Sequence, residues 1–344
     1  MAARRSISSL FLAVFLLISA APKLPAQAAE ELSLSRHLFD LAAHHAGSVS
    51  YFAQNLRSGQ SAGFGADVPV KTASVIKLAI LLHVASQIHS GQATLEDRLT
   101  LSAADQVGGS GVLVLLHPHL TLTVADALTL MTVLSDNTAT NMLLERFPIV
   151  EVNGTLAAMG FSQTRLLKKV LLDVDPARDQ VSAAEADTWG IGRSTAREAA
   201  MLMERLATCR FATDSSQPTA ADGPLCARLL EMLRHQQDRN SLPRYLIPAN
   251  HPEAASAIAN KTGSLDDVRN DVALVATPAG PIVMAGFTWQ NADTRWTGDN
   301  LAEQLLGRLA QATLRRWSPE GLKDAAFPWA NPLFDPSAQS AARQ

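Results

Sequence analysis

Cysteine, aromatic side chains and charged residues are all scarce in this sequence. Its 344 residues include two cysteines, 5% aromatic residues and 18% charged residues. Two cysteines exclude a disulfide-dense scaffold and a cysteine-rich zinc module. Lysine and arginine number 29 against 32 acidic residues, so no basic excess favours a nucleic acid partner. The sequence also lacks zinc-site motifs and a glycine-rich phosphate loop, and we therefore expect neither a metal nor a cofactor.

The N-terminal residues 1–28 have the layout of a secretory signal peptide. Arg4 and Arg5 precede the apolar run Leu10–Ile18, and Ala26–Ala28 offers a small-x-small cleavage site. An uncleaved anchor is the alternative, although a membrane-spanning helix needs about 20 apolar residues. We therefore predict an exported protein, periplasmic or secreted, without a stable membrane span after cleavage.

Export would place both cysteines, Cys209 and Cys226, in an oxidising compartment where disulfides form. They flank a polar loop between two helical patterns. A disulfide that closes this loop is one interpretation, and two small buried apolar side chains are the other.

Strand-like sequence occurs near both ends of the chain, and helical sequence lies between. The predicted strands are Ser48–Leu56, Ser61–Ala66, Ala255–Lys261, Asn270–Thr277 and Pro281–Trp289. Because an isolated hairpin is only marginally stable in water, the early strands should pair with the late ones. We predict an α+β fold in which terminal helices, at Glu31–Ala46 and 300–316, flank an antiparallel sheet. An all-helical lobe is inserted between the strands, and the cleft between the lobes is the expected place for an active site.

The predicted domain boundaries follow from this pattern. One catalytic domain over 29–317 combines an α/β lobe (about 29–70 and 250–317) with the helical lobe (about 71–249). Residues 318–344, rich in alanine, proline and serine, form a loose C-terminal tail. The helical periodicity is clearest over 74–89, 124–134, 137–146, 150–159, 195–208 and 224–235.

A serine and a lysine are spaced by three residues at the start of a buried helix. In Ser74-Val75-Ile76-Lys77 the spacing lets the Lys77 amine reach the Ser74 hydroxyl. A lysine in an apolar helix requires a partner for its charge or a lowered pKa. A lowered pKa suits a general base for a serine nucleophile. Taken alone, the pattern favours a lysine whose stem is buried and whose charge reaches solvent.

Two further motifs lie at the junctions of the predicted lobes. Ser135-Asp136-Asn137 separates two helices, and its simplest role is to cap the second helix. Lys261-Thr262-Gly263 ends a predicted strand, where a glycine turn would follow. Each motif is weak alone, and the specific signal is the order in which all three occur.

That order is the signature of class A β-lactamases and penicillin-binding proteins. The sequence resembles the class A β-lactamase-like serine hydrolases over residues 31–317, and the similarity extends through Ser135–Asn141. The resemblance implies the lobed fold predicted above. It also implies an enzyme whose small-molecule substrate is a β-lactam or a peptidoglycan stem, and we expect a monomer.

The resemblance assigns catalytic roles to four residues. Ser74 would be the nucleophile that becomes acylated, and Lys77 would be the base or part of the proton relay that activates it. Ser135 would pass a proton to the leaving nitrogen. Lys261 would hold the local field positive.

It also assigns the substrate-binding groups. Asn137 would bind the side-chain amide of the substrate, and Lys261 with Thr262 would receive its carboxylate. Gly263 completes that motif. The backbone N–H groups of Ser74 and Ser264 would form the oxyanion hole.

Arg269 lies on the predicted neighbouring strand, where the family often supplies a second cation for the carboxylate. The alternative is an ordinary strand-edge arginine paired with Asp267 or Asp271.

The sequence departs from the family where hydrolysis of the acyl-enzyme is decided. Class A enzymes carry a Glu-x-x-Leu-Asn loop, and residues 165–195 contain no such motif. Glu185 is the only glutamate in this segment and is our first candidate for a deacylation carboxylate. A solvated loop acid is the alternative. The other carboxylates there are Asp173, Asp175, Asp179 and Asp187.

Three functions are compatible with these motifs. The first is a serine β-lactamase that works through a Ser74 acyl-enzyme. The second is a D-Ala-D-Ala carboxypeptidase or other penicillin-binding protein, and the third is a β-lactam or muropeptide binder that is acylated without hydrolysis. The compact domain and the extended similarity around Ser135 favour the first, which we predict. The missing glutamate motif favours the other two.

Overall fold

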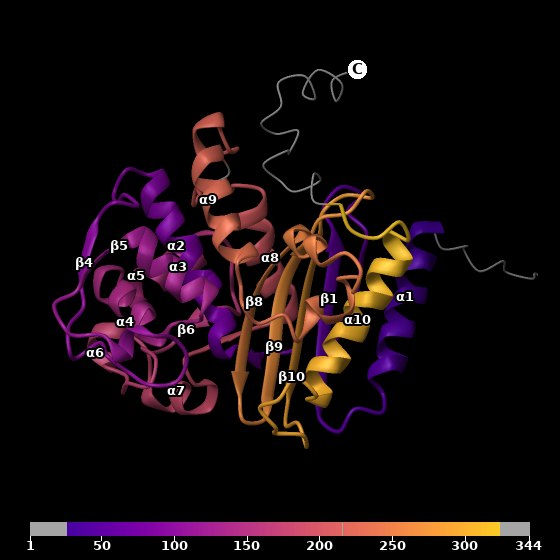
Figure 1. The fold of residues 1–344 in the computed structure, drawn as a ribbon, viewed down its shortest axis with the longest axis horizontal. Coiled ribbons are helices and arrows are strands. Elements are labelled where there is room, and N and C mark those ends of the chain that lie inside the picture. The colour runs from indigo at the N-terminus through magenta and orange to yellow at the C-terminus, as the bar shows by residue number, and fades with distance from the viewer. Residues whose placement is uncertain (1–25, 215, 324–344) are drawn as a thin grey trace, which may run out of the picture.

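The computed structural model describes residues 26–214 and 216–323, and its centre is a five-stranded antiparallel sheet (Figure 1). The strand order is β2-β1-β10-β9-β8, so β8 is an edge strand. Their bounds are β1 Ser48–Asn55, β2 Ser61–Phe64, β8 Ile258–Leu265, β9 Val268–Val275 and β10 Ile282–Trp289. The order confirms the predicted pairing of early with late strands.

The pairing of β1 with β10 joins two segments that lie near opposite ends of the chain. It runs in antiparallel register from Ser48 opposite Trp289 to Asn55 opposite Ile282. Both strands are almost wholly buried because helices cover both faces of the sheet.

Alternate side chains of the sheet enter two different apolar cores, as a period of two requires. In β9, Val272 and Leu274 belong to the larger core, whereas Ala273 and Val275 belong to the smaller one. Helices α1 (Ala26–Ala42) and α10 (Leu301–Trp317) cover the smaller core, on the right of Figure 1. Helix α8 (Ala196–Ala207) packs on the opposite face, against β1, β9 and β10.

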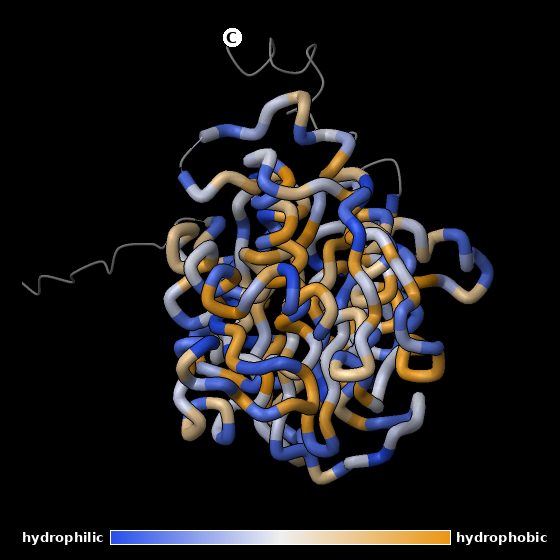
Figure 2. Tube along the Cα trace, turned by 90° about the vertical axis from the view of Figure 1, so that its left-hand side faces the viewer, coloured by the Kyte–Doolittle hydropathy of each residue, from blue (hydrophilic) through white to orange (hydrophobic). Residues whose placement is uncertain are grey.

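The helical lobe surrounds α2 (Lys77–His89), which is buried along most of its length. The other helices of this lobe are α3 Val124–Val133, α4 Asn137–Arg146, α5 Ile149–Ala158, α6 Pro176–Asp179, α7 Ala183–Trp189 and α9 Gly223–Arg234. In Figure 2, apolar segments gather in the interior and hydrophilic segments follow many of the outer loops.

The element boundaries differ most from the sequence prediction at α1 and β8, and by one to two residues at most other elements. Helix α1 begins at Ala26 and ends at Ala42, whereas the prediction was Glu31–Ala46. The Lys261-Thr262-Gly263 motif lies in the middle of β8 and does not end a strand, because β8 continues to Leu265 before the turn into β9.

The helical lobe also contains short strands that the sequence pattern did not indicate. They are β3 Val70–Lys71, β4 Arg98–Thr100, β5 Thr121–Thr123, β6 Arg165–Leu166 and β7 Gly192–Ser194. Strand β7 lies between β3 and β6, and so ties the segment before Ser74 to the 165–195 loop. Two- and three-residue strands are too short to produce a recognisable alternation.

The predicted signal sequence lies mostly outside the described residues, which begin at Ala26. Its last three residues, Ala26–Ala28, form the start of α1. Over the ranges 26–214 and 216–323, no helix combines the length and apolar character needed to cross a bilayer. Of the loose tail that we predict over residues 318–344, the structure describes residues 318–323, and residues 324–344 lie outside the described part of the chain.

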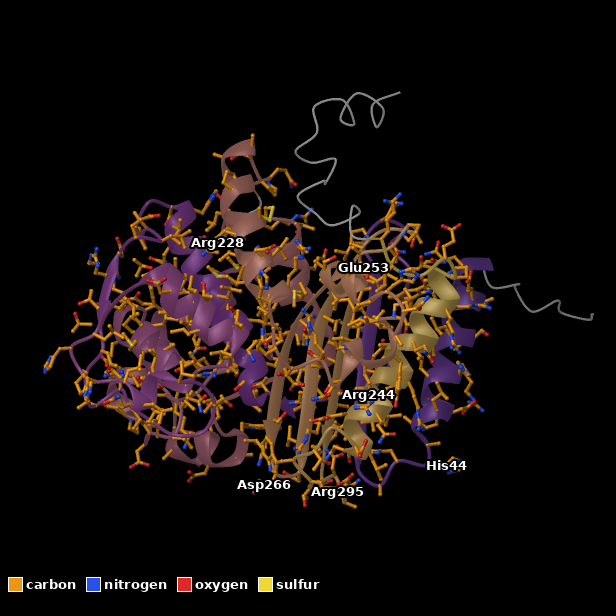
Figure 3. All side chains as sticks on the ribbon, in the orientation of Figure 1. His44, Arg228, Arg244, Glu253, Asp266 and Arg295 are labelled. Carbon is orange, nitrogen blue, oxygen red and sulfur yellow. A yellow bond between two sulfur atoms is a disulfide. The ribbon has the colours of Figure 1, made fainter. Side chains whose placement is uncertain are left out.

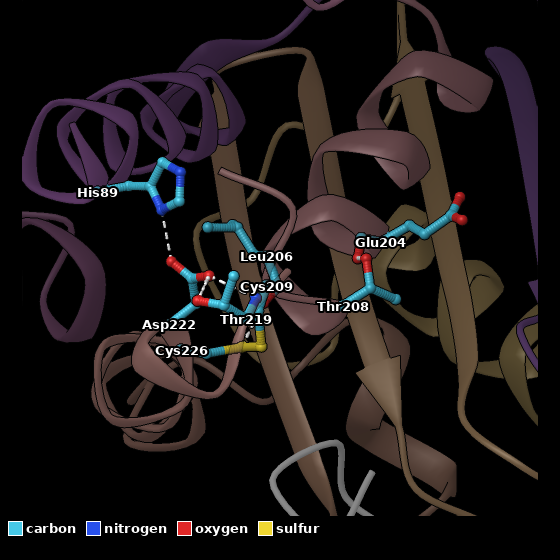
Figure 4. The surroundings of a disulfide bond; sticks show 8 residues. All are labelled: His89, Glu204, Leu206, Thr208, Cys209, Thr219, Asp222 and Cys226. Atoms are coloured by element: carbon cyan, nitrogen blue, oxygen red, sulfur yellow. Dashed lines mark hydrogen bonds and ion pairs between the residues drawn. A yellow bond between two sulfur atoms is a disulfide. The ribbon is translucent and has the colours of Figure 1, made fainter. Parts of the chain in front are cut away.

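Cys209 and Cys226 form a disulfide, so the interpretation as a covalent pair is confirmed (Figure 4). The bond joins the end of the α8 segment to α9 and closes the intervening polar loop. The same loop is held on its other side by Asp222, which accepts a hydrogen bond from His89 at 2.5 Å.

We expect the Cys209→Ser/Cys226→Ser double variant to lose about 3 kcal/mol of unfolding free energy, because the loop regains freedom in the unfolded chain. Urea denaturation measures this loss. A reductant should lower the stability of the parent protein to that of the variant and leave the variant unchanged. Equal stability of the oxidised parent and the variant would contradict this role for the disulfide.

Candidate active site

Ser74 lies where the sheet meets the helical lobe. It belongs to the 3-10 turn η1 (Ala73–Ile76), which leads directly into α2. Ala73, Val75 and Ile76 are buried, whereas Ser74 is partly exposed. Ala73 adopts a positive φ of 45°, a strained conformation for a residue with a side chain. Ser74 is thus the one residue of η1 that is accessible to solvent.

Lys77 is fully buried, and its amine faces the turn between α3 and α4. Its Nζ donates to the carbonyl oxygen of Ser135 at 2.6 Å, to Ser135 Oγ at 3.2 Å and to Asn137 Oδ1 at 2.9 Å. Its backbone N–H donates to the Ser74 carbonyl, which places the two residues one turn apart. Burial lowers the pKa of Lys77 well below its usual range, and the positive charge of Lys261 acts in the same direction.

A second buried amine contacts the same serine. Lys261 Nζ donates to Ser135 Oγ at 3.0 Å and to the Thr262 carbonyl at 2.7 Å. Burial lowers the pKa of Lys261 to about 8, although the carboxylate of Asp271 opposes this shift. Ser135 Oγ therefore lies between two amines, one from each lobe. This junction is formed by all three sequence motifs.

Asp136 anchors the rim loop, residues 105–113, to the start of α4. One carboxylate oxygen accepts the backbone N–H of Val112 at 2.6 Å and that of Leu113 at 3.0 Å. The other accepts from Ala139 N at 2.9 Å, which confirms the predicted helix cap. Capping and site construction are thus two functions of one buried side chain.

Asn137 joins this rim loop to Lys77. Its Nδ2 donates to the Gly108 carbonyl at 3.0 Å, and its backbone N–H donates to the Ser110 carbonyl at 3.0 Å. Oδ1 also accepts from Lys77, so each end of the side-chain amide has a partner. Because a primary amide has two N–H donors and two acceptor lone pairs, these bonds do not exhaust its capacity to bind a substrate amide.

Gly263 lets the edge strand β8 approach the backbone of η1. A Cβ at this position would lie 2.6 Å from the Thr72 carbonyl oxygen, 2.7 Å from Val75 N and 2.8 Å from Ser74 N. No side chain fits at these distances without backbone movement. The glycine therefore fixes the separation between Ser74 and the strand that carries Thr262 and Ser264.

Arg269 does not join this group of residues. Its guanidinium is 1% exposed and donates to backbone carbonyls, including those of Val268 at 2.8 Å and Arg295 at 2.9 Å. Glu303 of α10 is its ion-pair partner at 3.4 Å, and neither Asp267 nor Asp271 pairs with it. This placement corrects the expectation that Arg269 faces a substrate carboxylate. Arg295, whose carbonyl accepts one of these bonds from Arg269, is labelled in Figure 3 near the lower end of the sheet.

The residue after it, Asn270, points to the other face because strand side chains alternate. Its Nδ2 donates to the carbonyls of Lys71 at 2.8 Å and Thr72 at 3.2 Å, in the segment that leads to Ser74. Sequence reasoning missed Asn270. Its only available signal was a polar residue in an apolar strand.

Asn141 determines which residues of the 165–195 loop lie next to the site. Its side chain accepts from Val170 N at 2.9 Å and donates to the Val170 carbonyl at 3.1 Å. Asn141 lies one helical turn after Asn137 on α4, and so on the same face. The loop residue that Asn141 binds, one helical turn from Asn137, is therefore apolar Val170, which is buried but belongs to neither apolar core.

Glu185 has partners away from this cluster. It forms ion pairs with Arg165 at 3.8 Å and Arg193 at 3.6 Å, on strands β6 and β7. In the described part of the chain, no hydrogen bond or ion pair joins Glu185 to Ser74, Lys77 or their partners. The arrangement leaves its candidacy as a deacylation base without structural support.

The remaining acids of the loop are also engaged or exposed. Asp175 caps α6, and Asp179 is buried beside Arg178 at 3.3 Å. Asp173 and Asp187 are exposed.

A protein-family comparison identifies the group of proteins to which this chain belongs. The family model described as "Beta-lactamase enzyme family" matches residues 33–317. The chain belongs to this family. Its five-stranded sheet and helical lobe are the fold of class A β-lactamase structures.

Individual relatives are similar over nearly their whole length. A β-lactamase structure from Sphaerobacter thermophilus is 28% identical, with a TM-score of 0.65, and the match covers 82% of this chain and 95% of that one. A PBP-A mutant structure, solved as an acyl-enzyme with penicillin G, is 23% identical with a TM-score of 0.67 and coverages of 83% and 96%. The β-lactamase regulatory protein BlaB of Streptomyces cacaoi is 26% identical over 313 residues, covering 83% of this chain and 98% of its own.

We expect Gly263→Ala to slow acylation of the protein by about 100-fold, because a shift of about 1 Å at Ser74 is enough for such a loss. Labelling with a fluorescent penicillin over time measures the rate. The matched control is Gly154→Ala, since a Cβ on Gly154 in α5 meets nothing within 4 Å. Parent-like labelling of a folded Gly263→Ala protein would contradict the role of this close contact.

Proposed function

We propose that this family member is a serine enzyme that opens β-lactam rings and forms an acyl-enzyme at Ser74. The observation that carries the proposal is the contact of Ser135 Oγ with both Lys77 and Lys261. Lys77 in turn lies one turn after the partly exposed Ser74. A relay of this kind can take a proton from one atom and return it to another.

In the proposed acylation step, neutral Lys77 takes the proton of Ser74 as Oγ attacks the lactam carbonyl. A neutral amine has two N–H donors and one lone pair, so it gives up one of its three present acceptors to do so. The carbonyl oxygen becomes an oxyanion, which the N–H groups of Ser74 and Ser264 would stabilise.

Collapse of the tetrahedral intermediate breaks the lactam C–N bond. The leaving nitrogen takes the proton of Ser135, and Ser135 recovers a proton from Lys77, which returns to its neutral form. Lys261 stays positive beside Ser135, and together with Thr262 it would hold the substrate carboxylate. The step is balanced: one C–O bond forms, one C–N bond breaks, and one proton moves from Ser74 to nitrogen.

We further propose that water hydrolyses this acyl-enzyme slowly. A hydrolytic water needs a nearby base, and the loop residue that Asn141 holds beside the site is Val170. The loop carboxylates have other partners or are exposed, and Glu185 in particular is paired with two arginines. The function would then be that of a slow β-lactamase or of a penicillin-binding protein.

Transfer of the acyl group to water or to an amine on a peptidoglycan stem is the second candidate. The acyl-enzyme of a PBP-A mutant with penicillin G is consistent with formation of such a species on this fold. BlaB bears the name of a β-lactamase regulatory protein, which is not the name of a hydrolase. Export and the monomeric state stay predictions.

We expect Ser74→Ala to abolish covalent labelling by a fluorescent penicillin, because the proposed acyl-enzyme forms on the Ser74 hydroxyl. Lys77→Ala should retain labelling but slow it by at least ~100-fold, the contribution of a positioned general base. Intact-protein mass and labelling rates measure both. Labelling of the folded Ser74→Ala protein at the parent rate would refute the assignment of the nucleophile.

We expect Val170→Glu to speed release of the penicilloyl group by about 100-fold, because it places a carboxylate at the loop position that Asn141 holds. Decay of the acyl-enzyme mass after removal of free penicillin measures the release. Glu185→Gln is the comparison and should leave the release rate unchanged. Rapid multiple turnovers in the parent that Glu185→Gln stops would instead establish Glu185 as the base.

A further inference from the structure

Leu171 combines two unfavourable features at one position beside the proposed substrate site. Its φ is 55°, in the left-handed region that a leucine rarely adopts. Its side chain is 65% exposed, although it is apolar. A glycine or asparagine would relieve the strain, and a polar side chain would suit the exposure. The combination of both features at one residue next to the site calls for an explanation.

The place of Leu171 in the site suggests why these features occur together. Leu171 follows Val170, whose backbone is held by both ends of the Asn141 amide. A Cβ built on Gly109 would lie 3.9 Å from Leu171 Cδ1 and 2.7 Å from Asn137 Nδ2. The leucine side chain and the Asn137 amide thus approach the same point of the rim loop.

We propose that Leu171 is a specificity-determining residue that contacts an apolar acyl side chain of the substrate. The inference rests on the proposed function, in which Asn137 binds the amide that carries this side chain. A group attached to that amide leaves Asn137 beside Gly109 and Leu171. In that position an apolar group would cover the Leu171 side chain, which is otherwise exposed to solvent. The preferred substrates are therefore β-lactams with an aromatic or aliphatic acylamino group.

The test compares two penicillins that differ only in this group. Benzylpenicillin carries a phenylacetyl side chain, whereas 6-aminopenicillanic acid carries a free amine. We expect Leu171→Ala to lower the second-order acylation rate constant for benzylpenicillin by about tenfold, the usual effect of removing an apolar contact. The rate constant for 6-aminopenicillanic acid should change by less than about twofold.

Two further variants separate substrate contact from loop structure. Leu171→Gly removes the side chain and relieves the strained φ. It should therefore raise the melting temperature, and it should lower the acylation rate constant for benzylpenicillin by the same factor of about ten. Leu115→Ala, at a leucine that is 81% exposed on the loop that follows the rim loop, is the matched control and should change neither rate constant.

Each remaining outcome has a definite meaning. Equal slowing of both penicillins by Leu171→Ala would overturn the inference, because Leu171 would then only shape the loop. Unchanged rate constants for both compounds would overturn it as well. A parent protein that neither compound acylates would refute the proposed function itself, together with the inference that depends on it.

Discussion

Two buried lysine amines that share one serine hydroxyl are the constraint on which the site depends. Two positive charges on either side of Ser135 Oγ, away from water, repel each other strongly. The surroundings make the pair unequal. Burial disfavours the charged form of both lysines. The carboxylates of Asp271 and Asp238 favour the charged form of Lys261, whereas for Lys77 the opposing charge of Lys261 outweighs the favourable charge of Asp136. This inequality supports the proposed roles, in which Lys77 acts as the base and Lys261 keeps its positive charge.

The fold brings these amines together because β8 is an edge strand. One side of its backbone pairs with β9, and the other side faces the helical lobe. Gly263 allows the backbone of η1 to approach one face of β8, and on the same face Asn270 of β9 binds the carbonyls before Ser74. Backbone-to-backbone contact is rigid, so the distance between nucleophile and strand does not depend on long side chains.

The sequence predicted those features that leave a periodic or combinatorial pattern. The strands and helices, such as helix 137–146, leave a clear periodicity in the sequence, and the pairing of early with late strands follows from it. The three motifs in order indicate that Ser74, Lys77, Ser135 and Lys261 belong to one site. The face of a strand residue depends on register, which is why Arg269 was placed toward the substrate although it lies under α10. Thr262-Gly263 suggested the end of a strand because glycine is rare within strands, and only the approach of η1 explains it there.

In the proposed mechanism, acylation and hydrolysis depend on different parts of this molecule. The groups proposed for acylation are carried by η1 and α2, by the α3–α4 turn and by the sheet, and hydrogen bonds join Lys77, Ser135 and Lys261 among them. The 165–195 loop meets the site through the backbone of Val170, which Asn141 binds without regard to the side chain that Val170 carries. The residue at this loop position can therefore change while the fold and the acylating groups stay intact. Membership of the β-lactamase family thus carries information about the first half of the reaction, and the second half has to be argued from the loop of each member.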